Sequence, residues 1–151
     1  MNEVPLKFYY CSAALLISAT AVFGQGVKLL TIPKIEEVPQ IDGKLDDDCW
    51  AKAALAKDFR QRRPVEGASA TEKTEVRICR DEKVLYIGVR CFDSQPDKIR
   101  AGVMQRDAPV KGDDYFFILL DPFQRSREGY YFRTNANGAK GEALINSDMR
   151  R

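Results

Sequence analysis

The chain has 151 residues, of which 44% are hydrophobic and 30% are charged, with a formal net charge of +2. This length accommodates one domain at most, and the interleaved charges exclude the basic surface typical of nucleic-acid binders. The sequence contains no histidine, which removes the commonest general base, the Ser–His and Cys–His nucleophiles and the usual zinc ligands. Any chemistry must therefore use carboxylates, lysine, tyrosine or cysteine.

Residues 1–24 are predicted to be a cleaved signal peptide. Lys7 precedes the apolar, small-residue run CSAALLISATAVFG, which at about 14 residues is too short to span a bilayer. We therefore expect an exported protein that resides in the periplasm, at the outer membrane or outside the cell, with no transmembrane helix in its mature chain. Three cysteines remain after cleavage, and this odd number implies a free thiol or an intermolecular bond.

Residues 25–38 form a lead-in segment whose prolines suit an edge strand or an arm. Asp42 and Gly43 then predict a turn, because glycine adopts the positive φ that most residues avoid. Asp46 or Asp47 is placed to cap a short helix, DDCWAKAALA, that continues to residue 56. Trp50 lies in the first turn of this helix, where we expect a buried packing anchor.

The same segment offers a second interpretation as a metal site. Calcium favours clustered carboxylate oxygens, and Asp46, Asp47 and Asp48 are consecutive. Their spacing does not match an EF-hand loop, so turn and helix cap are the favoured roles. Structural calcium is the one cofactor that the sequence suggests.

Residues 75–80 and 84–92 predict a β-hairpin with its turn at 81–83. This register places Val76 opposite Val89, and Glu75 opposite Arg90. One apolar face then holds Val76, Ile78, Leu85, Ile87, Val89 and Cys91. Cys79 is expected on the outer face and Cys91 on the inner one, so a disulfide between them is geometrically excluded and both are expected to be free thiols.

The remaining sequence predicts further strands. SQPDKI indicates a loop or a single helical turn, and residues 113–123 form a strand that is apolar on both faces. YYFRTNA leads to a hairpin turn at Asn137 and Gly138, followed by a last strand at about 142–145. The chain is thus predicted to be mainly an antiparallel β-sandwich with one short N-terminal helix. Because no closing element follows the last strand, we expect residues 39–151 to be the C-terminally truncated front portion of this domain.

Four segments together resemble the family 9 carbohydrate-binding module, as found at the N-terminus of exported bacterial proteins with a long C-terminal region of poorly known function. They are PQIDGKLDDDCWAKA, TEVRICRDEKVLYIGVRCFD, RD…GDDYFFILLDPF and GYYFRTNANGA. The resemblance covers about residues 39–139 and implies an antiparallel β-sandwich. It also implies non-catalytic binding of polysaccharide or oligosaccharide in the service of polysaccharide breakdown, and structural calcium. The best understood members clamp a sugar end between two tryptophans, whereas Trp50 is the only one in this chain. Tyrosine or phenylalanine rings are therefore the candidate stacking faces.

Polar groups near the predicted strand ends are the candidate sugar ligands, because loops gather at the ends of a sandwich. They are Arg106, Asp107, Asp113, Tyr115, Arg133 and Asn135. Guanidinium and amide groups can bond two vicinal hydroxyls, but the same residues could instead anchor loops, for example through an Arg106–Asp113 salt bridge.

Three functions follow: a carbohydrate-binding module, a structural sandwich domain that packs against its own C-terminal region, or part of a glycoside hydrolase. No catalytic residue is predicted. Asp114 and Asp121 lie roughly 23 Å apart along the predicted strand, too far for the paired carboxylates of a glycosidase.

Overall fold

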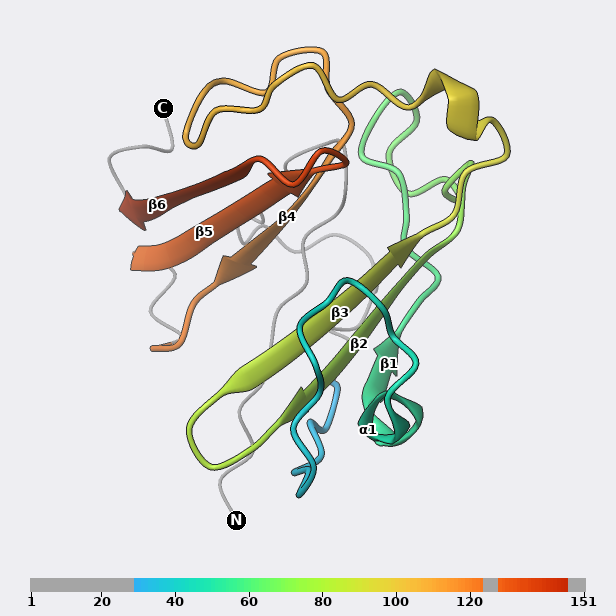
Figure 1. Cartoon of the computed structure of the whole chain (residues 1–151). Helices are drawn as coiled ribbons and strands as arrows, with labels where there is room; N and C mark the ends of the chain where they lie inside the picture. The colour runs from blue at the N-terminus through green and yellow to red at the C-terminus, as the bar shows by residue number, and fades with distance from the viewer. Residues whose placement is uncertain (1–28, 124–127, 147–151) are drawn as a thin grey trace, which may run out of the picture. The chain divides into compact units, whose positions relative to one another are not determined.

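The computed structural model describes residues 29–123 and 128–146, and the predicted signal peptide lies outside them. Within these ranges the chain forms helix α1 (Asp48–Lys52), the 3-10 helix η1 (Pro96–Lys98) and six strands arranged in two antiparallel sheets (Figure 1). The predicted all-β class, with one short helix near the start, is confirmed. The described residues contain no helix with the length and apolar character needed to span a bilayer.

The chain divides into two compact units, each with one three-stranded sheet. The first unit, residues 29–59 and 69–94, contains β1 (Ala54–Ala56), β2 (Thr74–Arg80) and β3 (Leu85–Cys91) in that order across its sheet. The described part of the second unit, residues 60–68, 95–123 and 128–146, contains β4 (Tyr115–Leu120), β5 (Glu128–Asn135) and β6 (Lys140–Asn146), also in chain order. Each sheet is thus a simple meander.

The β2–β3 hairpin has the register predicted from the sequence. Val76 lies opposite Val89, and Glu75 lies opposite Arg90. The side chain of Asp81 organises the turn, since its Oδ1 accepts hydrogen bonds from the backbone amides of Lys83 (2.6 Å) and Val84 (2.7 Å). This local carboxylate explains why the turn begins where the period-two pattern stops.

The prediction that Cys79 lies on an outer face is wrong. Its side chain is 0% exposed and belongs to a buried cluster with Ile35, Cys49, Trp50 and Tyr86. The lead-in segment and α1 cover this face of β2, so the strand is buried on both sides. Cys91, expected to point inward, is exposed, although both residues are free thiols as predicted.

The predicted helix is also too long. α1 ends at Lys52, and Ala54–Ala56 forms strand β1, which pairs antiparallel with β2. Backbone pairing with an existing strand outweighs the helix propensity of alanine. Asp47 occupies the N-cap as predicted, but its side chain makes no capping hydrogen bond.

Two other predicted features are present. Gly43 has φ +86°, and Asp42 Oδ1 accepts a hydrogen bond from the Lys44 amide at 2.9 Å, which confirms the turn. The lead-in segment continues the edge of the sheet beyond β1, because the amide of Ile35 donates to the carbonyl of Arg80 at 2.8 Å. Ile35 is thereby placed in the core.

Candidate functional site

Asn135 and Asp113 organise the loops at one end of the second sheet. Asn135 is 6% exposed, and its side-chain amide donates to Val103 O (2.7 Å) and Asp113 Oδ2 (2.9 Å). Asp113 also accepts hydrogen bonds from the amides of Gly102 (2.9 Å) and Val103 (3.0 Å). The loop before β4 is therefore fastened to the end of β5 by side chains whose hydrogen-bonding groups are already engaged.

Arg133 and Asp107 fasten the same loop at other points. Arg133 Nη2 donates to the carbonyl of Ala108 at 2.7 Å. Asp107 has a positive φ of 61° and accepts a hydrogen bond from the Glu142 amide at 3.1 Å. These two candidate ligands act as loop anchors in the structure.

Arg106 differs from the other candidates because its guanidinium lies on the surface. It forms an ion pair with Glu142, and its Nε lies 3.6 Å from Asp107 Oδ2. The sequence left open that these residues anchor loops, for example through an Arg106–Asp113 salt bridge. In the structure Arg106 pairs with Glu142 instead. Tyr115 is half-buried, with its ring centroid 6.2 Å from that of Phe117.

Two aromatic rings stand exposed on one face of β5. Tyr130 is 42% exposed and Phe132 is 44% exposed. Residues two apart on a strand point to the same side, about 7 Å from each other. This spacing presents the two rings next to one another on one surface.

Polar side chains border these rings. Glu142 pairs with Phe132 across the β5–β6 ladder, and Lys140 pairs with Thr134. Directly paired residues share a face of the sheet, so these polar groups lie beside the aromatic rings. The ion pair of Glu142 with Arg106 brings that guanidinium to the same place. We name this surface the β5 aromatic face; its members are Tyr130, Phe132, Thr134, Lys140, Glu142 and Arg106.

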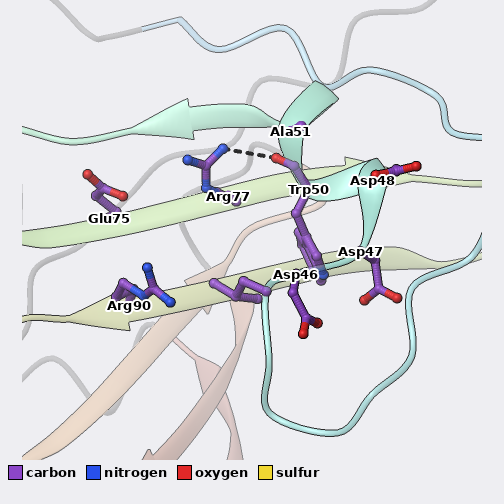
Figure 2. Close-up of a pocket in the computed structure, with 9 residues that line it drawn as sticks. Asp46, Asp47, Asp48, Trp50, Ala51, Glu75, Arg77 and Arg90 are labelled. Atoms are coloured by element: carbon purple, nitrogen blue, oxygen red, sulfur yellow. Dashed lines mark hydrogen bonds between the residues drawn. The ribbon is translucent and has the colours of Figure 1, made fainter.

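The first unit contains a pocket of about 230 Å³ beside α1. Charged side chains supply most of its lining, as Figure 2 shows: Asp46, Asp47, Asp48, Glu75, Arg77 and Arg90. Arg77 Nη1 donates to the carbonyl of Trp50 at 2.9 Å, which holds α1 against β2. Glu75 pairs with Lys73 at 2.6 Å, and this bond, followed by the positive charges around it, lowers the pKa of Glu75.

Trp50 lines this pocket but offers it no exposed stacking face, because only 4% of the residue is exposed. A Cβ added at Gly88 would lie 3.0 Å from its ring, so the indole packs directly on the β3 backbone. The indole Nε1 and Asp47 Oδ2 are buried and find no hydrogen-bond partner among the described residues. Because Trp50 is buried, the pocket gives a sugar ring no aromatic surface on which to stack.

A family model described as carbohydrate family 9 binding domain-like matches residues 41–131. This match covers more than half of the 151 residues. The chain belongs to the carbohydrate family 9 binding domain-like family. No curated protein and no solved structure matches it.

Membership of the family 9-like domains confirms the resemblance inferred from the sequence and supports carbohydrate binding. The segment YYFRTNA was predicted only to lead to the turn at Asn137 and Gly138, and its sequence does not show which of its aromatic side chains are exposed. Tyr130 and Phe132 were therefore missed as individual candidates, although tyrosine and phenylalanine were expected as a class.

The consecutive aspartates of this family 9-like domain do not fit a calcium site. Figure 2 shows the carboxylate of Asp48 directed away from those of Asp46 and Asp47. Among the residues that the structure describes, no group of three or more His, Cys, Asp or Glu side chains is arranged to hold a metal ion. Calcium at this segment thus gains no support from the geometry.

Proposed function

We propose that this chain is a non-catalytic carbohydrate-binding module that takes a polysaccharide or oligosaccharide on the β5 aromatic face. The observation that carries the proposal is the pair of exposed rings, Tyr130 and Phe132, in a chain of the family 9-like domains. Sugar C–H groups pack on apolar ring faces, and two rings side by side offer consecutive platforms to a glycan. The site needs no tryptophan clamp.

The polar members of the face supply hydrogen-bonding groups, which glycan recognition requires in addition to stacking. Carboxylate, ammonium, hydroxyl and guanidinium groups lie beside the rings, at Glu142, Lys140, Thr134 and Arg106. Such groups donate and accept hydrogen bonds with sugar hydroxyls. A face with both stacking and hydrogen-bonding groups suits a neutral glycan better than the pocket beside Trp50, because Trp50 is only 4% exposed.

Isothermal titration of the chain against a panel of soluble glycans tests this proposal. We expect one or more glycans to bind, and Tyr130→Ala and Phe132→Ala each to weaken that binding about tenfold, the equivalent of one stacking contact. Phe92→Ala is the matched control, since Phe92 is an exposed ring on the first unit that packs under Lys73. Equal affinities for wild type and both β5 variants would refute the assignment of the face.

The proposed biological setting is export and service in polysaccharide breakdown. Residues 1–24 support export because they have the charge, length and small-residue pattern of a signal peptide. The mass of the protein recovered from the producing cells tests this point. Retention of residues 1–24 would contradict it.

A structural domain is the second candidate, and Leu144 favours it. This side chain is 66% exposed and pairs with Tyr130 across the ladder, so an exposed aliphatic side chain borders the β5 aromatic face. In this alternative the face packs on another protein segment, such as the protein's own C-terminal region. This alternative predicts that isothermal titration detects no heat of binding with any glycan. It also predicts that the chain self-associates, and that Leu144→Ser reduces this self-association as measured by light scattering.

A further inference from the structure

Cys49 and Cys79 lie together in the buried cluster of the first unit. Cys49 is 5% exposed and Cys79 is 0% exposed. Both belong to the same hydrophobic cluster, and the two thiols are hydrogen-bonded to each other. The sequence gives little sign of this contact, because 30 positions separate the two cysteines.

The fold holds these two thiols together by two independent attachments. Arg77 and Cys79 share a face of β2, since they are two residues apart. Arg77 Nη1 binds the carbonyl of Trp50 at 2.9 Å, which fixes the residue adjacent to Cys49 over that face. The second attachment is the β1–β2 ladder, in which Ala54 pairs with Ile78, next to Cys79.

We propose that Cys49 and Cys79 form an intramolecular disulfide when the chain folds in the presence of a disulfide oxidant. The thiolate of one cysteine attacks the oxidant's disulfide and releases one oxidant thiol. The thiolate of the other cysteine then attacks the mixed disulfide at the cysteine sulfur, which forms the Cys49–Cys79 bond and releases the second oxidant thiol. Two electrons and two protons pass from the cysteine pair to the oxidant, whether this is glutathione disulfide or a protein dithiol oxidase.

Oxidation must precede complete burial. Burial, with the neighbouring Cys49 as a smaller contribution, raises the pKa of Cys79 to about 11, and burial also raises the pKa of Cys49. The thiolate is the nucleophile in disulfide exchange, so the folded dithiol reacts slowly. Cys91 is exposed, unlike the two buried cysteines, and takes no part in the proposed disulfide.

Refolding of the reduced chain of residues 25–151, which lacks the predicted signal peptide and its Cys11, in a glutathione redox buffer tests the proposal. After free thiols are blocked with N-ethylmaleimide, non-reducing tryptic mapping should join the peptide of residues 45–52 to that of residues 78–80 and find Cys91 blocked. The oxidised Cys91→Ala chain should melt about 5–10 °C above its reduced form, as expected for a cross-link that closes a loop of this length.

The double variant Cys49→Ala/Cys91→Ala is the matched control and should show no difference between the two redox states. A cross-link that includes Cys91 would overturn the proposal. Modification of both Cys49 and Cys79 by N-ethylmaleimide in the refolded, oxidised wild type would also overturn it. This second measurement does not depend on the folding of any variant.

Discussion

The side chain of Asn135 spans the gap between a β-hairpin turn and the loop before β4 by bonding to Asp113. Its amide nitrogen lies 2.9 Å from Asp113 Oδ2. On the other side, its Oδ1 accepts hydrogen bonds from the amides of Ala139 (2.9 Å) and Asn137 (3.1 Å). One buried amide thus satisfies the backbone of a turn and fixes the loop that carries Arg106.

Asn135→Ala should destabilise the second unit. The substitution removes four hydrogen bonds and leaves the carbonyl of Val103 and the amide of Ala139 without their side-chain partner. We expect the free energy of unfolding to fall by about 2–4 kcal/mol, because unsatisfied buried polar groups are costly. Urea denaturation followed by circular dichroism measures the change.

Thr134→Val is the matched control for this substitution. Thr134 is the exposed neighbour of Asn135 on β5, and valine preserves its branched shape. We expect a change within about 0.5 kcal/mol. If Asn135→Ala were no more destabilising than Thr134→Val, the amide would not organise these loops.

Asp113 should make stability depend on pH in the acid range. The amides of Val103 and Gly102 and the side chain of Asn135 donate to its carboxylate and lower its pKa. A carboxyl group whose pKa is lower in the folded state stabilises the fold above its unfolded pKa, and that contribution disappears as the pH falls through the folded pKa. The free energy of unfolding should therefore decline as the pH falls below about 4.

Asp113→Asn tests this dependence. The variant should be less stable at pH 7, because an amide cannot accept hydrogen bonds at both of its terminal atoms. It should also lose less stability than wild type between pH 5 and pH 3, as urea titrations at several pH values will show. Parallel pH profiles for the two proteins would rule out Asp113 as a source of the acid sensitivity.

Local patterns in the sequence predicted much of the backbone. Asn137 and Gly138 specify a turn, and Gly138 has φ +77°. Alternation of apolar residues in β2 and β3 fixed their register, because a slip of one residue would move every side chain to the other face. These features depend on neighbours along the chain, so the sequence is sufficient to predict them.

The errors arose where distant segments decide the structure. Cys79 alternates with Ile78 as predicted, but α1 and the lead-in segment bury the face that it shares with Arg77. Ala54 has high helix propensity, yet its backbone pairs with Ile78. Prediction of the site was limited for the same reason. The residue type of Tyr130 indicated a stacking group, whereas the exposure of its ring depends on tertiary packing.

Gly88→Ala should destabilise the first unit. An added Cβ would lie 2.6 Å from Leu45 Cδ2 and 3.0 Å from the ring of Trp50. The leucine can rotate, but the indole is packed in the core, so we expect a loss of about 1–3 kcal/mol. Because Trp50 is the only tryptophan, its fluorescence during urea unfolding reports this unit directly.

Gly102→Ala provides the comparison for Gly88→Ala. A Cβ at Gly102 would meet Asp113 Oδ1 at an ordinary 3.6 Å, and its backbone amide is retained. This variant should unfold with the wild-type fluorescence midpoint. If the Gly88→Ala variant also unfolded at the wild-type midpoint, the Trp50 ring would accommodate the added methyl group without a loss of stability.

Arg106→Ala separates ligand binding from loop anchoring. Arg106 and Glu142 form an ion pair whose side chains are 60% and 51% exposed, and exposed pairs contribute about 0–1 kcal/mol to stability. The fold should therefore survive the substitution, whereas glycan affinity should fall about threefold to tenfold, since the guanidinium lies beside the β5 rings. Lys34→Ala removes half of another exposed ion pair, with Glu82 in the first unit, and should leave affinity unchanged. If Phe132→Ala weakened binding while Arg106→Ala did not, the rings would form the site without this guanidinium, and Arg106 would be an anchor alone.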